Sequence, residues 1–132
     1  MKDHIKLTIV TPEKEFYSGE ILNLYTESEK GRFGILANHV SMVAPLKPTV
    51  TTFIDLNGKE LKAFTSTGVL SVHNNQVEIL CSACEWPGDI DIERSRKAKE
   101  RAEERLNHKD TNDVKRAENA VLRAIMRIKA TE

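Results

Sequence analysis

The sequence predicts an N-terminal all-β sandwich or flattened barrel over residues 1–86, followed by a hinge and a C-terminal antiparallel two-helix hairpin over residues 87–132. Composition changes abruptly at this division: all seven aromatic residues and all four prolines precede Gly88, and no aromatic, glycine, proline or cysteine follows it. The second part instead carries seven arginines among Ala, Glu, Lys and Leu, a composition typical of helices. About 45 residues are too few to bury a core, so we expect the hairpin to pack on another surface.

Apolar residues alternate along the first part, which is the pattern of half-buried strands. The alternating residues are Ile5, Leu7 and Ile9, then Ile21, Leu24 and Tyr25, then Leu61, Phe64, Leu70, Val72, Val77 and Ile79. Prolines and glycines interrupt this pattern at the spacing of a sandwich and divide it into roughly eight to ten strands. No alternation of strands with helices is visible, which argues against a parallel nucleotide-binding sheet.

Two short turns are predicted between these strands. Asn57-Gly58 separates two strand-like segments and favours a type I′ turn, in which both central residues have positive φ. A second turn is predicted at Asn74-Asn75.

The segment Trp86-Pro87-Gly88 is the predicted hinge, because proline lacks a backbone donor and glycine permits almost any exit angle. Asp89 or Asp91 is then expected to cap a first helix over residues 91–106. This helix carries a narrow stripe of mostly small residues, which permits close approach of a partner helix: Ser95, Ala98, Ala102 and Leu106.

A second helix is predicted over residues 113–130, after a turn at residues 107–112 and with Asn112 or Asp113 as its cap. Its apolar residues repeat as a heptad seam: Val114, Ala117, Val121, Ala124 and Ile128. Leu122, Ile125 and Met126 widen the seam beyond what the first helix can cover. We therefore expect the hairpin to dock on another surface and to be detachable from it.

Charge and hydropathy argue against several classes of protein. The chain has 20 basic and 20 acidic residues, and its net charge of zero gives no support for binding to nucleic acid or to an anionic membrane. No apolar run approaches the ~18 residues of a membrane span, and the N-terminus lacks the apolar core of a signal peptide. We therefore expect a soluble, cytoplasmic chain.

No motif for catalysis or metal binding is evident. The chain has no phosphate-binding P-loop motif, its four histidines are scattered, and no second cysteine pair completes a zinc site with Cys81 and Cys84. We expect neither an enzyme nor a metalloprotein. At odd spacing in a strand the two cysteines should point to opposite faces, which favours packed or exposed thiols over a redox pair.

The arginines of the helical part suggest an anion site. If the two helices pack antiparallel, Arg94 lies near residue ~125, so that Arg94, Arg123 and Arg127 gather at one end, with Arg101 two turns further along. Such a cluster suits a polyanion such as a nucleoside triphosphate. Charge pattern alone instead favours solvated pairs, for example Arg96 with Glu100 and Glu93 with Lys97.

One stretch of the first part carries a family resemblance. The run Gly31-Arg32-Phe33-Gly34-Ile35-Leu36-Ala37-Asn38-His39, followed by Val43-Ala44-Pro45-Leu46-Lys47, resembles the Gly-x-x-Gly-Ile-Leu-x-x-His stretch of the epsilon subunit of bacterial F-type ATP synthases. Further matches fall in family order over essentially the whole chain: Val10-Thr11-Pro12, Gly68 with Val72, Ala83-x-Glu85, and Arg123-Ala124-x-x-Arg127.

The resemblance implies a non-catalytic subunit of the central stalk. Its sandwich would touch the gamma subunit and the c-ring, with Asn38 and His39 on a contact loop, at the cytoplasmic face of the cell membrane. Its hairpin would lie folded on the sandwich or extend toward the alpha and beta subunits, where it restrains ATP hydrolysis.

The resemblance also implies regulatory ATP binding to the folded hairpin, with the presence of magnesium left open. Some members bind ATP through an Ile/Leu-Asp-x-x-Arg-Ala motif, which stands here as Ile90-Asp91-Ile92-Glu93-Arg94-Ser95. The positions that match the family's ATP contacts are Glu85, Asp91, Arg94, Arg101, Arg123 and Arg127. The alternatives are a free-standing nucleotide-sensing adaptor built on the same sandwich and, more remotely, a nucleic-acid module on the arginine helices.

Overall fold

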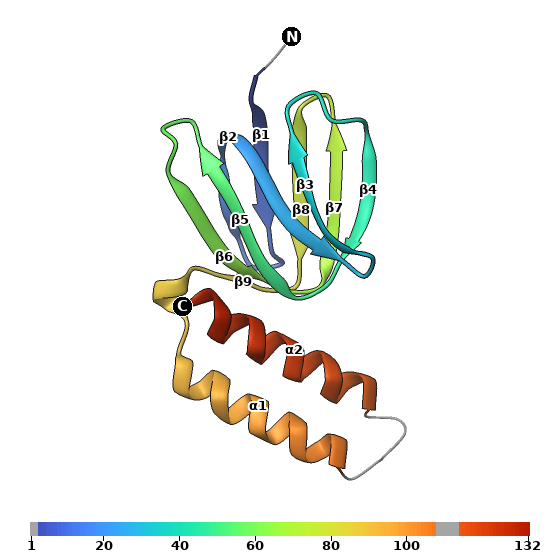
Figure 1. Cartoon of the computed structure of the whole chain (residues 1–132), viewed down its shortest axis with the longest axis vertical. Coiled ribbons are helices and arrows are strands. Elements are labelled where there is room, and N and C mark those ends of the chain that lie inside the picture. The colour runs from blue at the N-terminus through green and yellow to red at the C-terminus, as the bar shows by residue number, and fades with distance from the viewer. Residues whose placement is uncertain (1–2, 108–113) are drawn as a thin grey trace.

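The computed structural model describes residues 3–107 and 114–132, and in these residues nine strands are followed by two long helices (Figure 1). The strands have the following bounds: β1 Ile5–Val10, β2 Glu15–Ser28, β3 Gly31–Leu36, β4 Met42–Leu46, β5 Thr49–Asp55, β6 Glu60–Thr65, β7 Gly68–His73, β8 Gln76–Cys81 and β9 Cys84–Glu85. A short 3₁₀ helix, η1, covers Pro87–Asp89, and the long helices are α1, Ile92–Asn107, and α2, Val114–Ala130.

The strands form one hydrogen-bonded sheet that folds back on itself. Its order is β4-β7-β8-β1-β2-β5-β6-β9, and β3 pairs with β2. The long strand β2 belongs to both halves, because its first part pairs with β1 and its second part pairs with β3 and β5. A register shift between Ile21 and Asn23 marks the bend in this strand. The predicted sandwich followed by a helical hairpin is confirmed.

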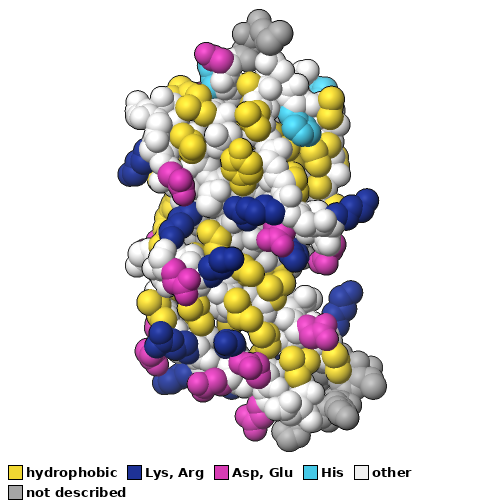
Figure 2. Space-filling model, in the orientation of Figure 1, with side chains coloured by type: hydrophobic (Ala, Val, Ile, Leu, Met, Phe, Trp, Pro, Cys, Tyr) yellow, Lys and Arg dark blue, Asp and Glu magenta, His cyan; other side chains and the backbone are white. Residues whose placement is uncertain are grey.

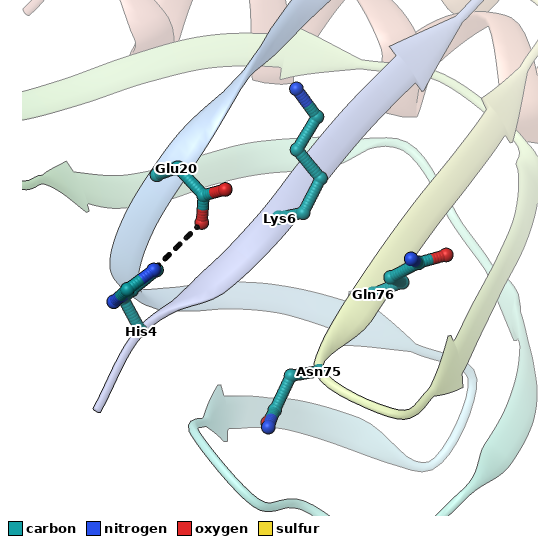
Figure 3. A pocket seen from close by; sticks show the side chains of 5 residues that line it. All are labelled: His4, Lys6, Glu20, Asn75 and Gln76. Atoms are coloured by element: carbon teal, nitrogen blue, oxygen red, sulfur yellow. Dashed lines mark ion pairs between the residues drawn. The ribbon is translucent and has the colours of Figure 1, made fainter. Parts of the chain in front are cut away.

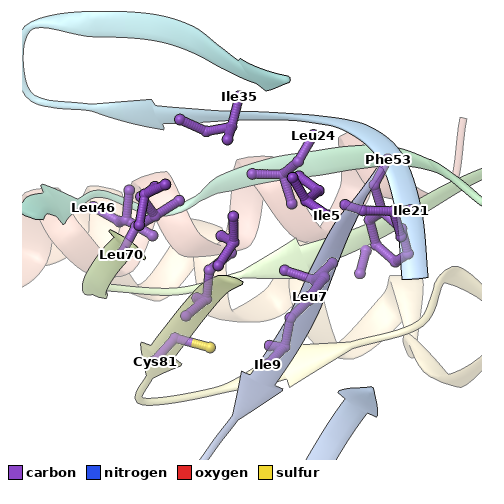
Figure 4. Packing of buried hydrophobic residues seen from close by; sticks show 14 of the residues in the cluster. Ile5, Leu7, Ile9, Ile21, Leu24, Ile35, Leu46, Phe53, Leu70 and Cys81 are labelled. Carbon is purple, nitrogen blue, oxygen red and sulfur yellow. The ribbon is translucent and has the colours of Figure 1, made fainter. Parts of the chain in front are cut away.

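The core lies between the two halves of the sheet, where the inward side chains of most strands meet (Figure 4). The alternation of apolar residues predicted most of these positions, and its fully buried members include Ile5, Leu7, Ile9, Ile21 and Leu24. Tyr25 differs from the prediction, because it faces outward and remains 40% exposed. Its ring covers Gly34 on the neighbouring strand, where a Cβ atom would lie 2.4 Å from a ring carbon.

The two predicted turns have different geometries. Asn74 and Asn75 both have positive φ, 50° and 61°, as a type I′ turn requires. The type I′ prediction at Asn57-Gly58 is wrong, because only Gly58 of that pair has positive φ. The Asp55 carboxylate accepts hydrogen bonds from the backbone N–H groups of Asn57 and Lys59, so a side chain organises a longer turn here.

The two cysteines also differ from the prediction. Cys81 ends β8 and Cys84 begins β9, and both side chains are buried in the same core as free thiols. Packed thiols are confirmed, but the expectation of opposite faces is wrong. The chain bends at residues 82–83 as it crosses from one half of the sheet to the other, and the inner face of each half points to the core.

The helices pack side by side and antiparallel below the sandwich (Figure 1). Small buried residues allow this close approach: Ser95 and Ala102 on α1, and Ala117 and Ala124 on α2. The predicted turn at residues 107–112 and its caps, Asn112 and Asp113, lie outside the described residues, except for Asn107 at the end of α1.

The end of α2 attaches the hairpin to the sandwich. Ala130 and Met126 of α2 pack with Phe64 of β6, Val50 of β5 and Ile90 of the hinge in a second, smaller apolar cluster. The Lys62 ammonium donates to the backbone oxygen of Glu132 at the same end. The hairpin therefore has its own small set of contacts, separate from the core of the sandwich.

Candidate functional site

A pocket of about 380 Å³ lies where α1, α2 and the end of the sandwich meet. Five of the six residues predicted to contact ATP line it, together with three that were not predicted. The lining residues are Glu85, Asp89, Asp91, Arg94, Ser95, Ala98, Arg101 and Arg127. The pocket thus takes side chains from three parts of the chain.

Helix α1 presents one face of its first three turns to the pocket. The Asp91 carboxylate accepts a hydrogen bond of 3.0 Å from the backbone N–H of Arg94, which makes Asp91 the helix cap, one of the two residues predicted for that role. Arg94, Ala98 and Arg101 follow at spacings of four and three residues, so they share one face of the helix. The cap fixes where this face begins and thus places both arginines.

Arg127 joins α2 to the sandwich at the other wall of the pocket. Its Nε donates to Oε1 of Glu85 over 2.6 Å, and its guanidinium carbon lies 4.5 Å from the centroid of the Phe64 ring. Both charged side chains are largely shielded, with exposed fractions of 27% for Arg127 and 31% for Glu85. We call these three residues, Arg127, Glu85 and Phe64, the latch.

The charges of the pocket suit a polyphosphate. Three guanidinium groups face three carboxylates, but Arg127 is paired and the Asp91 carboxylate caps the helix. Within the described residues, the side chains of Arg94 and Arg101 have no hydrogen-bond or ion-pair partner. Two unpaired guanidinium groups on one helix face can donate to the oxygens of an anion such as a phosphate group.

The sixth predicted residue, Arg123, does not line the pocket. It lies one turn before Arg127 on α2 and is half-buried. Asp89, Ser95 and Ala98 were not predicted as ATP contacts. Ala98 could have been found, because it lies one turn after Arg94 on the same face.

Surface ion pairs form elsewhere on α1, but with other partners than those suggested. Arg96 pairs with Glu93 at 3.1 Å, three residues away, and Lys99 approaches Glu103 at 4.0 Å. On the face shown in Figure 2, acidic and basic side chains are intermixed over the helices, whereas Lys and Arg predominate across the waist between helices and sandwich.

The predicted contact loop with Asn38 and His39 connects β3 and β4. Asn38 has a positive φ of 66°, and its backbone N–H donates to the side chain of Asn75. The His39 ring bonds to the backbone oxygen of Val40 over 2.8 Å. Val40 and Val43 beside it are 75% and 74% exposed, so the loop presents apolar side chains to solvent.

A second pocket, of about 320 Å³, is lined in part by Asn75, and Figure 3 shows its side chains. His4 and Glu20 form an ion pair of 3.3 Å on one side of it, if the histidine is protonated, and Lys6 and Gln76 complete the lining. Within residues 3–107 and 114–132, no three acidic, histidine or cysteine side chains gather as a metal site would require.

The fold and the pocket define a class of protein: a β-sandwich that carries a docked two-helix hairpin, with a pocket lined by arginines and carboxylates at the junction. Two family models match in succession, the ATP synthase delta/epsilon chain beta-sandwich domain over residues 4–87 and the ATP synthase delta/epsilon chain long alpha-helix domain over residues 89–132. The chain belongs to the epsilon-chain family of F-type ATP synthases.

Close relatives span the same length. The ATP synthase epsilon chain of Clostridium kluyveri is 52% identical over 97% of both chains. That of Clostridium botulinum, strain Okra, is 56% identical over 100% of this chain and 99% of the relative.

Solved structures share the fold at low sequence identity. A chain of the Euglena gracilis mitochondrial ATP synthase, in a structure of OSCP, F1 and c-ring, has a TM-score of 0.89 at 22% identity, covering 100% of this chain and 84% of that one. A chain of the central stalk and c-ring of the Tetrahymena thermophila enzyme has a TM-score of 0.61 at 14% identity, covering 97% and 96%. No helix among the described residues is long and apolar enough to cross a membrane.

Proposed function

We propose that the docked hairpin binds ATP in the pocket between α1, α2 and the sandwich, and that this binding holds the hairpin in its docked position. The proposal depends on one observation: the residues that line the pocket come from different elements. Arg94 and Arg101 belong to α1, Arg127 belongs to α2, and Glu85 belongs to β9. These side chains are together only when the hairpin is docked. A ligand that needs all of them binds the docked state alone and favours it.

Release of the hairpin is the other half of the proposed switch. We propose that an undocked hairpin extends along the gamma subunit toward the alpha and beta subunits and restrains ATP hydrolysis there. The half-buried seam of Val114, Val121 and Ile128 would then find a new apolar partner. Residues 87–132 are thus the proposed regulatory part, and ATP is the proposed regulatory ligand.

The sandwich, residues 1–86, is proposed to join the gamma subunit to the c-ring and so couple rotation to ATP synthesis driven by a proton or sodium gradient. The relatives are named epsilon chains of ATP synthase, and the solved neighbours come from assemblies described as F1/c-ring and central stalk/c-ring. The Asn38-His39 loop, with exposed Val40 and Val43, is the proposed contact. The chain would thereby sit peripherally at the cytoplasmic face of the membrane.

Calorimetric titration of the full chain with ATP tests the pocket. The wild type should bind, and Arg94→Ala or Arg101→Ala should each weaken binding by about 10-fold or more, because a charge-assisted contact contributes about 1.5–3 kcal/mol. Arg96→Ala is the matched control, since Arg96 lies on the same helix but pairs with Glu93 outside the pocket. If all three substitutions changed ATP affinity equally, the proposal that ATP binds in this pocket would be contradicted.

Co-purification tests the stalk role separately. The chain co-expressed with its gamma subunit should be recovered as a stable complex, and Val43→Lys should reduce the recovery. Leu56→Lys is the control, because Leu56 is also exposed but lies in the turn between β5 and β6. A chain that binds ATP and never retains gamma would instead support the free-standing adaptor.

A further inference from the structure

A third pocket, of about 290 Å³, lies where the C-terminal end of α2 packs on the outer face of β5 and β6. The register of the strands builds its floor. Thr52 of β5 lies opposite Lys62 of β6, and Arg32 of β3 lies opposite Glu27 of β2. Helix α2 closes the other side, and no lining residue is shared with the proposed ATP pocket.

Three cationic side chains from three elements line this pocket. Arg32 belongs to β3, Lys62 to β6 and Lys129 to α2. Within residues 3–107 and 114–132, none of the three forms an ion pair with a carboxylate side chain. Like charges in one pocket repel each other, so these three side chains oppose docking of α2 unless an anion lies between them.

The carboxylate of Glu27 also lines the pocket, but other groups already hold it. Its Oε1 accepts a hydrogen bond of 3.0 Å from the Thr49 hydroxyl, and its Oε2 lies 3.0 Å from the Lys47 ammonium. Lys47 is not among the lining residues, so the charge of Glu27 is balanced from outside the pocket. The positive charge of the three cations is therefore left over.

The guanidinium group of Arg32 is fixed at the wall of the pocket. It donates to the backbone oxygen of Val50 over 3.1 Å and to the hydroxyl oxygen of Thr52 over 3.4 Å. Two of its five N–H donors are used in this way, and the others remain available. The Thr52 hydroxyl accepts from Arg32 and can still donate its own O–H. Two preorganised donor groups thus stand on the sandwich side.

The two lysines bring further donors from both sides of the pocket. The Lys62 ammonium donates to the backbone oxygen of Glu132, which uses one of its three N–H groups. The Lys129 ammonium has no hydrogen-bond partner in the part of the chain that the structure describes. Lys129 is the cation that α2 contributes, so the full set of donors exists only while the hairpin is docked.

We propose that this pocket binds a free oxyanion of the phosphate type, and that the bound anion attaches the end of α2 to the sandwich. The oxygens of phosphate accept from a guanidinium fork, from ammonium groups and from a hydroxyl, which are the donors present here. A ligand that needs Lys129 as well as Arg32 binds the docked state and favours it. The proposal does not depend on ATP binding, because the two pockets have no residue in common.

Calorimetric titration of the full chain with inorganic phosphate, at an ionic strength held constant with chloride, tests the site. The wild type should bind saturably, and Lys129→Met or Arg32→Met should each weaken binding by about 3- to 5-fold, because solvent still reaches both side chains. Lys59→Met is the matched control at an exposed position outside the pocket and should bind as the wild type does.

Three results would overturn the anion site. The first is no saturable binding up to about 10 mM phosphate. The second is a loss of affinity in Lys59→Met equal to that in Lys129→Met. The third is weaker binding in Arg94→Ala with unchanged binding in Lys129→Met, which would place the anion in the other pocket.

Hydrogen exchange at the amides of α2 tests the attachment. Phosphate at ten times its dissociation constant should slow exchange by about 10-fold in the wild type, because a ligand of the docked state alone reduces the undocked population by that factor. Lys129→Met should show a smaller effect at the same concentration. Bound phosphate that leaves exchange unchanged, or chloride at matched ionic strength that slows it equally, would overturn the attachment.

Discussion

Replacement of Arg127 by methionine should release the hairpin from the sandwich, because Arg127 carries the polar part of the latch. Methionine retains an unbranched apolar chain of similar reach but removes the guanidinium from Glu85 and from the Phe64 ring. A charge-assisted hydrogen bond contributes about 1.5–3 kcal/mol, and a cation–π contact adds about 0.5–1 kcal/mol. Solvent still reaches both partners of the ion pair, whose exposed fractions are 27% and 31%, so the lower part of this range applies.

We therefore expect Arg127→Met to reduce the free energy of docking by about 2 kcal/mol, which corresponds to roughly 30-fold in the docking equilibrium. Hydrogen exchange measures this change, because amides of α2 that are protected by docking exchange in proportion to the undocked population. Arg123→Met is the matched control, since Arg123 lies one turn away on α2 and does not line the pocket. It should change the exchange rates by less than about 3-fold.

A double-mutant cycle isolates the ion pair from the rest of the latch. Glu85→Gln removes the acidic partner, and the double variant removes both. The coupling free energy between the two positions should be about 1–2 kcal/mol, because side chains in direct contact are not additive. Additive effects, or equal effects of Arg127→Met and Arg123→Met on exchange, would refute the argument that this pair attaches the hairpin.

Three further predictions concern the sandwich. Gly68→Ala should destabilise the fold by about 2 kcal/mol or more in denaturant unfolding, because the new Cβ would lie 2.1 Å from the Leu80 oxygen. Thr51→Val should cost about 1–3 kcal/mol, since the Thr51 hydroxyl bonds two other buried threonine hydroxyls over 2.9 and 2.7 Å. Lys47 holds the pKa of Glu27 below its ordinary value of 4.5, so this ion pair stabilises the fold above that pH and is lost as the pH falls through the lowered pKa. Lys47→Met should therefore reduce the decrease in unfolding free energy that acidification causes, measured by denaturant unfolding at a series of pH values.

Each of these predictions has a control in the chain. Gly88→Ala should be tolerated, because nothing lies within 4 Å of a Cβ atom at that position. Thr67→Val should change little, since Thr67 is exposed. Lys59→Met, at an exposed position, should leave this pH dependence unchanged. A glycine, threonine or lysine variant that behaves like its control would contradict the contact to which its effect is attributed.

The fold could be predicted because its signals are local or depend on composition. Alternation of Ile5, Leu7 and Ile9 defines an inner face of β1 whatever strand lies beside it. The loss of glycine, proline and aromatic residues after Gly88 likewise marks the helices without knowledge of tertiary contacts. Helix capping is local too: a cap bonds a backbone N–H within the next three positions, so the sequence alone limits the cap of α1 to Asp89 or Asp91, and Asp91 has this role.

What could not be predicted depends on contacts that the local pattern does not contain. At Asn57-Gly58 the carboxylate of Asp55 organises the turn, and this side chain was not part of the dipeptide signal. A regular strand would place Cys81 and Cys84 on opposite faces, whereas the chain bends between them and crosses from one half of the sheet to the other. Arg123 and Arg127 lie one turn apart on α2, so the helical pattern alone does not distinguish them. Arg127 is the one that lines the pocket, because Glu85 of the sandwich lies within reach of its side chain.

The latch and the proposed ATP site share Arg127 without competing for it. A guanidinium group has five N–H donors, and the structure uses one of them, on Nε, for Glu85. The terminal nitrogens remain available to phosphate oxygens on the pocket side. Binding of ATP would therefore add to the attachment of α2 instead of displacing Glu85, and Arg94 and Arg101 would extend the same ligand to α1. A lysine at this position could not serve both partners in this geometry, because its single ammonium is a point charge without the planar fork. If ATP binds as proposed, the docked hairpin and its ligand would stabilise each other for this reason.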